Sequence, residues 1–108
     1  MKIMTEKLIL EKIDNIAKIT INNPSANTWD LESLAGLEEI IEHLNQDDGI
    51  FSLVITGQGE KFFSAGADLK VFQEGGKDAA KEMSNAFSNA FDSLSKFRGV
   101  SIAAINGF

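Results

Sequence analysis

The chain has 108 residues, 44% of them hydrophobic and 24% charged, which is the composition of one globular domain and not of a disordered segment. Sixteen acidic residues against ten basic ones give a net charge of −6, which argues against a nucleic-acid partner. The sequence has no cysteine, no apolar run of about eighteen residues and no signal-peptide core, so we expect a cytoplasmic protein without disulfides, thiolate zinc or a membrane span.

Two β-rich runs open the chain, at residues 7–13 and 16–22. The dipeptide Asp14-Asn15 between them is a two-residue hairpin signal. In the second run every other residue is apolar, which predicts one buried face. Pro24, the only proline, closes the pair because it has no N–H to donate to a ladder.

A helix is predicted over residues 30–46, with Thr28 or Asp30 as its N-cap. Its apolar residues recur at helical spacing: Leu31, Leu34, Leu37, Ile40, Ile41 and Leu44. His43 is the only histidine, and no serine, cysteine or second histidine is spaced to form a triad or a metal site with it. We therefore expect His43 to be an exposed helix residue.

The second half of the chain predicts a strand, a loop, a helix and a strand. Residues 51–56 form a nearly continuous apolar run, which suits a parallel strand buried on both faces. Gly75-Gly76 precedes a long helix at 77–97, for which Arg98-Gly99 supplies a C-terminal cation and a glycine cap. A strand at 100–105 follows as an exposed edge. The order ββ, α, β, loop, α, β indicates an α/β fold.

The loop after the buried strand is the most informative stretch. Residues 62–70 read Phe-Phe-Ser-Ala-Gly-Ala-Asp-Leu-Lys, and a short helical turn begins near Asp68. Small side chains let a ligand approach the backbone, and the free N–H groups at a helix start favour an anionic oxygen or phosphate. The local chemistry predicts a backbone cradle for an anion, although a tight connection alone would have the same composition.

Three stretches in register resemble the landmarks of the crotonase superfamily, also called the enoyl-CoA hydratase/isomerase family. Residues 64–70 resemble its signature loop, residues 102–108 resemble the strand before its second, glycine-rich oxyanion turn, and residues 23–27 resemble the loop after its second strand. Members fold as a spiral of ββα turns. The resemblance implies that residues 1–108 are the N-terminal part, less than half, of a single crotonase-like domain.

The resemblance also implies a site. In the family, the carbonyl of an acyl-CoA thioester lies between two backbone N–H groups, and the position of the first matches Ala67. The loop would wrap coenzyme A, and the loop at 23–27 would close over it, through Ala26 or Asn27. The matching substrate-binding residues are Ala26, Ser64, Ala65, Ala67, Asp68, Leu69 and Lys70. Without the resemblance, Asp68 is interpreted as a helix N-cap and Lys70 as a solvated lysine.

The function implied is hydration of 2-enoyl-CoA thioesters, with an isomerase of the same family or a non-catalytic acyl-CoA-binding protein as alternatives. The two glutamates of family hydratases lie beyond the second oxyanion turn, so we expect the 108-residue chain alone to be inactive.

Coenzyme A is part of the substrate, so no separate cofactor and no metal is expected. Family members form trimers or hexamers. Phe72, Phe87 and Phe91 line an acyl tunnel or, as the simpler interpretation, the core.

Overall fold

The structure is a computed structural model that describes residues 5–108, except for the side chains of residues 71 and 72. The predicted role of Phe72 in an acyl tunnel therefore lies outside the described part. The elements follow the predicted order: β1 (Leu8–Ile13), β2 (Ile16–Ile21), α1 (Leu31–Asn45), β3 (Ser52–Gly57), α2 (Leu69–Ser95) and β4 (Val100–Ala103).

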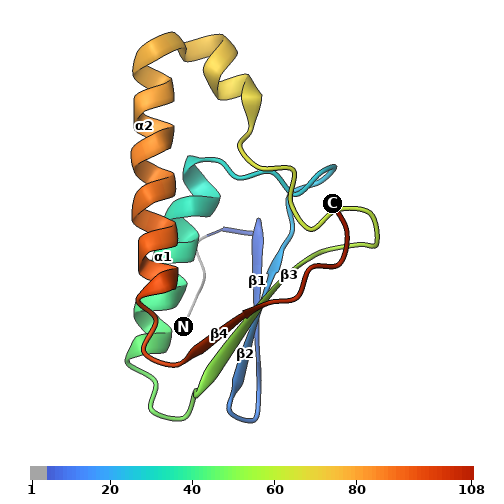
Figure 1. The fold of residues 1–108 in the computed structure, drawn as a ribbon, viewed down its shortest axis with the longest axis vertical. Coiled ribbons are helices and arrows are strands. Elements are labelled where there is room, and N and C mark those ends of the chain that lie inside the picture. The colour runs from blue at the N-terminus through green and yellow to red at the C-terminus, as the bar shows by residue number, and fades with distance from the viewer. Residues whose placement is uncertain (1–4) are drawn as a thin grey trace.

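The strands form one mixed sheet in the order β1-β2-β3-β4 (Figure 1). β1 and β2 are antiparallel and joined by the predicted two-residue turn, where Asp14 has a φ of 54°. β2, β3 and β4 are parallel, with Ile16 opposite Ser52 and Ser52 opposite Val100. The mixed α/β architecture predicted from the element order is confirmed.

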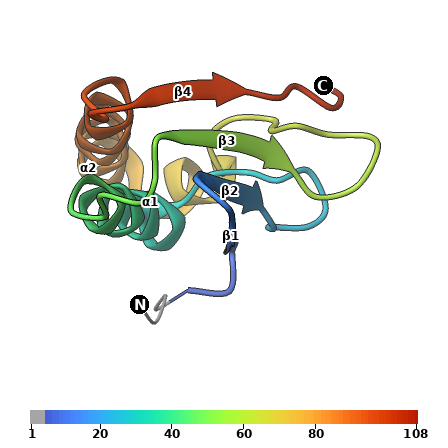
Figure 2. The same cartoon turned by 90° about the horizontal axis from the view of Figure 1, so that it is seen from below.

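Both helices lie on one side of the sheet, and α1 packs against α2 (Figures 1 and 2). The alternating residues of β2 that were predicted to be buried face them: Ala17, Ile19 and Ile21 are fully inaccessible to solvent. The apolar stripe of α1 meets this face, and its buried hydrophobic members are Leu34, Leu37, Ile40, Ile41 and Leu44. Burial of one such side chain stabilises a fold by about 1.5–3 kcal/mol, so this interface holds the domain together.

Helix α1 begins with a capping box, which fixes its first turn. The Asp30 carboxylate accepts from the Ser33 N–H at 2.9 Å, and the Ser33 hydroxyl lies 2.9 Å from the Asp30 N–H, which donates to it. Asp30 was one of the two predicted N-caps. The arrangement satisfies two backbone donors that would otherwise have no partner.

Helix α2 changes direction at Gly76, where φ is +64° and ψ is −143°. The backbone therefore follows the predicted scheme of a short helical turn after the loop and a long helix from residue 77. Glycine is suited to this position because a side chain would be strained at positive φ.

The end of α2 differs from the prediction. The helix ends at Ser95, and its last turn carries no basic residue. Arg98 instead reaches the C-terminus of α1, where its Nε donates to the Asn45 carbonyl at 3.0 Å and its Nη2 donates to the carbonyls of Leu44, Asp47 and Ile50. The cation does complement a helix C-terminus, but it is the terminus of the other helix.

Two further features bear on the predictions. His43 is half-buried, not exposed, and its Nε2 lies 2.9 Å from Lys12 Nζ. β4 is the outer strand of the described sheet, as expected, and its Val100 and Ile102 are 62% and 50% exposed (Figure 2).

Within residues 5–108, no helix is both long and apolar enough to cross a membrane. The same residues contain no cluster of three or more acidic or histidine side chains arranged to hold a metal ion.

Candidate functional site

The loop between β3 and α2 folds back over the end of β3. Gly57, the last residue of β3, makes this possible, because a Cβ there would lie 2.5 Å from the carbonyl oxygens of Phe62 and Phe63. The C-terminal segment supports the loop from the other side, where the Phe108 carbonyl accepts from the N–H groups of Phe63 and Ser64 at 2.6 and 3.0 Å. The red C-terminal end runs beside this loop in both views (Figures 1 and 2).

The loop is joined to the segment before α1 by an isolated parallel bridge between Trp29 and Ala67. The Trp29 N–H donates to the Gly66 carbonyl at 2.8 Å, and the Asp68 N–H donates to the Trp29 carbonyl at 2.9 Å. In a parallel ladder, a residue that is flanked in this way turns its own N–H to the opposite side. Ala67 is in that position.

The neighbouring amides of the loop are all engaged. The Ala65 N–H donates to the Ala26 carbonyl at 2.9 Å, the Gly66 N–H donates to the Ser64 hydroxyl at 3.1 Å, and the Asp68 N–H is held in the bridge. Within the described residues, the Ala67 N–H has no acceptor, and it is the only one from Phe63 to Asp68 without one. A backbone donor left in this state is available to a ligand.

A cavity of about 540 Å³ opens at Ala67. Its lining residues are Thr28, Ala65, Ala67, Asp68, Leu69, Lys70 and Gln73. A second cavity of about 370 Å³ adjoins it and shares Thr28, Asp68 and Lys70 with it. Hollows of similar size occur between the helices and beside the start of β1, so the free N–H and not the volume marks this one as the candidate site.

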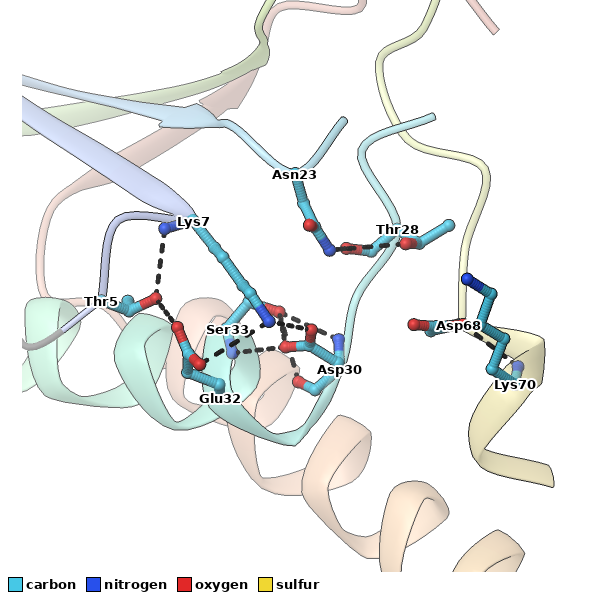
Figure 3. Close-up of polar contacts among 9 residues, drawn as sticks. All are labelled: Thr5, Lys7, Asn23, Thr28, Asp30, Glu32, Ser33, Asp68 and Lys70. Atoms are coloured by element: carbon cyan, nitrogen blue, oxygen red, sulfur yellow. Dashed lines mark hydrogen bonds and ion pairs between the residues drawn. The ribbon is translucent and has the colours of Figure 1, made fainter. Parts of the chain in front are cut away.

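Asp68 acts as the N-cap of α2, since its carboxylate accepts from the Lys70 N–H at 3.1 Å. The simpler interpretation of Asp68 is thereby confirmed, and a ligand contact would be additional to it. Lys70 is exposed, has no ion-pair partner in the described part of the chain, and extends past Asp68 toward the loop that holds Thr28 (Figure 3). Leu69 is 68% exposed.

A second cation beside the cavity is already neutralised. Lys7 Nζ lies 2.5 Å from the Asp30 carboxylate and 3.6 Å from that of Glu32 (Figure 3). The hydrogen bond to Asp30 raises the pKa of Lys7, although partial burial opposes it. Burial would raise the pKa of Asp30, but hydrogen bonds from Lys7 and Ser33 outweigh it and hold that pKa below its usual value. The positive charge of Lys70, unlike that of Lys7, is therefore not neutralised by an ion pair among the described residues.

The structure brings most of the predicted site residues together. Ser64, Ala65, Ala67 and Asp68 lie on one loop, Leu69 and Lys70 follow in the first turn of α2, and the Ala26 carbonyl meets the loop at the Ala65 N–H. Asn27 differs: its side chain is 3% exposed and points into the protein, so it supports the loop and does not reach the cavity. No role was predicted for the Asn106 side chain, which also binds the loop.

A model of one protein family matches residues 11–108, and its description is enoyl-CoA hydratase/isomerase. The chain belongs to that family. The resemblance stated from residues 23–27, 64–70 and 102–108 is confirmed, and with it the expectation of a crotonase-type fold.

Curated members of the enoyl-CoA hydratase/isomerase family align over nearly the whole chain. Crotonyl-CoA hydratase of Syntrophomonas wolfei is 34% identical over 104 residues, which are 95% of this chain and 40% of that protein. Carnitinyl-CoA dehydratase of Escherichia coli K12 is 35% identical over 105 residues, covering 97% of this chain and 40% of that protein. The chain thus spans about 40% of the length of these relatives.

Solved structures of other proteins show the same fold. DspI of Pseudomonas aeruginosa superposes with a TM-score of 0.93 and 62% identity over 96% of this chain and 40% of that one. An enoyl-CoA hydratase of Bacillus anthracis gives a TM-score of 0.91 and 27% identity over 94% of this chain and 40% of that one.

Proposed function

We propose that this chain is the N-terminal part of an enzyme that hydrates 2-enoyl-CoA thioesters, and that Ala67 supplies one backbone N–H of its oxyanion hole. The observation that carries the proposal is the Ala67 N–H, which among the described residues is the only amide from Phe63 to Asp68 without an acceptor, on a residue that lines a cavity together with Thr28 and Lys70. Membership of the enoyl-CoA hydratase/isomerase family supports the substrate class.

The chemistry explains why such an amide matters. When the oxygen of water bonds to C3 of the enoyl group, a general base takes one proton of the water, the electrons of the double bond move toward the thioester, and the carbonyl oxygen becomes an enolate anion. A proton then adds to C2 and the carbonyl re-forms. A fixed N–H stabilises the anion without reorganising, and loss of one such donor costs about 3–4 kcal/mol.

Binding of coenzyme A is assigned to the rest of the loop. Lys70 lies close enough to the cavity to pair with a phosphate, and a lysine acts there as a point charge. Ala65 and Ala26 line the two cavities, Ser64 precedes Ala65 in the loop, and Asp68 and Leu69 are assigned to the adenine. The overall charge of −6 opposes a polyanion, so this local cation has a large effect on affinity.

The carboxylates that activate water are proposed to lie C-terminal to Phe108, in the part of the relatives that this chain does not span. Glu60 and Glu74 are both exposed near the loop, and neither is assigned a catalytic role. Isomerisation of an enoyl-CoA in the same family would use the same Ala67 N–H, because it also passes through an enolate. The assembly proposed is a trimer or a pair of trimers in the cytoplasm.

Replacement of Ala67 tests the proposal. Ala67→Pro deletes the N–H, whereas Ala67→Ser changes the side chain and keeps it. In the full-length protein, we expect Ala67→Pro to lower kcat for crotonyl-CoA by about 10²–10³-fold, and Ala67→Ser to stay within a few-fold of the parent. Turnover of crotonyl-CoA at the parental rate by a folded Ala67→Pro variant would contradict the assignment of the Ala67 N–H. If the parent enzyme shifts the double bond of an enoyl-CoA and adds no hydroxyl, the isomerase is favoured over the hydratase.

A further inference from the structure

The carbonyl oxygen of Phe62, in the loop that leads to Ala67, accepts two side-chain hydrogen bonds. One comes from Asn27 Nδ2 at 3.0 Å and the other from Asn106 Nδ2 at 3.2 Å. The two asparagines belong to segments on either side of the loop. Their amide groups therefore hold one backbone oxygen between them.

Burial and hydrogen bonds hold the Asn27 side chain in this position. Its side chain is 3% exposed, its Oδ1 accepts from the Asn23 N–H at 3.2 Å, and its Nδ2 also donates to the Gln58 carbonyl at 3.1 Å. Its backbone has a φ of +53°, a conformation that asparagine tolerates better than most residues. A buried amide with all these partners fixes the groups around it, because each partner would be left unsatisfied if it moved.

Asn106 makes a matching set of contacts from the C-terminal segment. Its Oδ1 accepts from the Gly57 N–H at 3.0 Å, and its Nδ2 donates to the Gly59 carbonyl at 2.9 Å as well as to Phe62. Asn106 thus spans the loop from its first residues to its middle.

These contacts join the loop that carries Ala67 to the segment that binds the backbone beside Ala67. The segment of Asn27 also carries Ala26, which binds the Ala65 N–H, and Trp29, which forms the bridge at Ala67. If the Phe62 carbonyl were released, the first half of the loop could shift relative to that segment, and only the Ala65 hydrogen bond and the Trp29 bridge would then hold Ala67 in place.

We infer that Asn27 and Asn106 are positioning residues for the Ala67 N–H, acting through the carbonyl of Phe62. The inference rests on the proposed oxyanion role of Ala67. A purely structural role for the two asparagines would change the stability of the fold and the affinity for every ligand alike. A positioning role changes one quantity selectively, which is the affinity contributed by the ligand's carbonyl oxygen.

A pair of ligands isolates that quantity. Butyryl-CoA has a thioester carbonyl, and S-butyl-CoA is the thioether that lacks only this oxygen. The ratio of their dissociation constants, measured by titration calorimetry on the full-length protein, reports the contact with the Ala67 N–H. We expect the parent chain to bind butyryl-CoA more tightly than S-butyl-CoA.

Asn106→Asp removes both donors and keeps the size of the side chain and an oxygen for the Gly57 N–H. Asn106→Ser removes the reach to Phe62 without adding a charge. Asn89→Asp, on the exposed side of α2, is the matched control. We expect both Asn106 variants to lose most of the preference for butyryl-CoA, by up to about tenfold, with affinity for S-butyl-CoA within about twofold of the parent. The control should behave as the parent.

Asn27→Ser adds a test of the shared acceptor. Because both amides act through one oxygen, the double variant Asn27→Ser/Asn106→Ser should lose less preference than the product of the two single losses. Independent, multiplicative losses would contradict action through Phe62.

The failures are distinguishable. If the parent shows no preference for butyryl-CoA, both the proposed function and this inference are wrong. If the parent shows the preference and the folded Asn106 variants keep it, or if they lose affinity for both ligands equally, only the inference is wrong. Should the variants not fold, NMR of the parent decides: the side-chain amide protons of Asn27 and Asn106 should shift with butyryl-CoA and not with S-butyl-CoA, and equal responses would overturn the inference.

Discussion

Trp29 binds the backbone on both sides of Ala67 and leaves the Ala67 N–H free. Trp29 is itself held in place, since it is 4% exposed and its ring meets that of Phe91 edge-on, with centroids 5.5 Å apart. Phe91 in turn stacks on Phe87 of the same helix. The aromatic side chains of α2 therefore support the candidate oxyanion donor through Trp29, a structural role that leaves the predicted acyl tunnel untested.

Lys70 should contribute to binding of coenzyme A independently of the acyl group. We expect Lys70→Ala to weaken butyryl-CoA and S-butyl-CoA by the same factor, about 5–10-fold at low salt, because it removes a charge that pairs with phosphate. The effect should shrink as salt is added. Lys81→Ala, an exposed lysine farther along α2, is the control. A Lys70→Ala chain that binds both ligands as the parent does would show that Lys70 is only solvated.

Because of the Lys7–Asp30 pair, the free energy of unfolding should depend on pH in the acid range. The folded pKa of Asp30 lies below its usual value of about 3.9, so its ionised form stabilises the fold above that pH. This contribution is lost as the pH falls through the folded pKa. Asp30→Asn keeps an acceptor for the Ser33 N–H but cannot ionise.

We therefore expect urea denaturation of Asp30→Asn to show a weaker loss of stability between about pH 5 and 2 than that of the parent. Asp30→Ala also removes the N-cap and should lower the free energy of unfolding by about 1 kcal/mol more at neutral pH. Identical acid profiles for the parent and Asp30→Asn would mean that the ion pair contributes nothing.

Arg98 should stabilise the junction between α1 and β4. Its planar guanidinium reaches four carbonyls between Leu44 and Ile50, which one ammonium group cannot do. We expect Arg98→Lys to lower the free energy of unfolding by about 1–2 kcal/mol in urea denaturation. Lys96→Met breaks only an exposed pair with Asp92 and should cost less than about 0.5 kcal/mol. Equal effects of the two changes would refute the capping role of Arg98.

Local patterns were sufficient to predict the elements. The helical spacing in residues 30–46, the turn at Asp14-Asn15 and the break at Gly75-Gly76 each depend on residues close in sequence, and the structure has all three. Arg98 could not be assigned in this way. Its acceptor on Asn45 lies 53 residues away, and the short-range pattern pointed to the nearer helix end.

The residues by themselves predicted the candidate site as a loop but not as a particular amide. Small residues and Gly66 mark a backbone cradle, and the family resemblance selects Ala67. Which amide is free follows from the Trp29 bridge and the Ala26 carbonyl, both of them long-range contacts. The same limit applies to Asn27, whose inward side chain depends on the position of Phe62.

The exposed face of β4 should promote self-association of the 108-residue chain. The exposed fractions of Val100 and Ile102 are 62% and 50%. Among the described residues, the outer edge of β4 has no partner strand. Unpaired, apolar edges tend to pair with other chains. We expect Ile102→Lys to shift light scattering at high concentration toward the monomer, whereas Lys18→Arg on β2, which does not pair with β4, should not. An unchanged scattering profile would place the contact elsewhere.

The central claim is that the Ala67 N–H binds the carbonyl oxygen of an acyl-CoA thioester. Its most direct measurement is the amide proton shift of Ala67 in ¹H–¹⁵N spectra of the chain titrated with butyryl-CoA and with S-butyl-CoA. A hydrogen bond to the carbonyl predicts a downfield shift with butyryl-CoA alone, while the amides of Ala65 and Asp68, which already have partners, respond alike to both ligands. If the Ala67 amide responds identically to the thioester and the thioether, it is not the oxyanion donor.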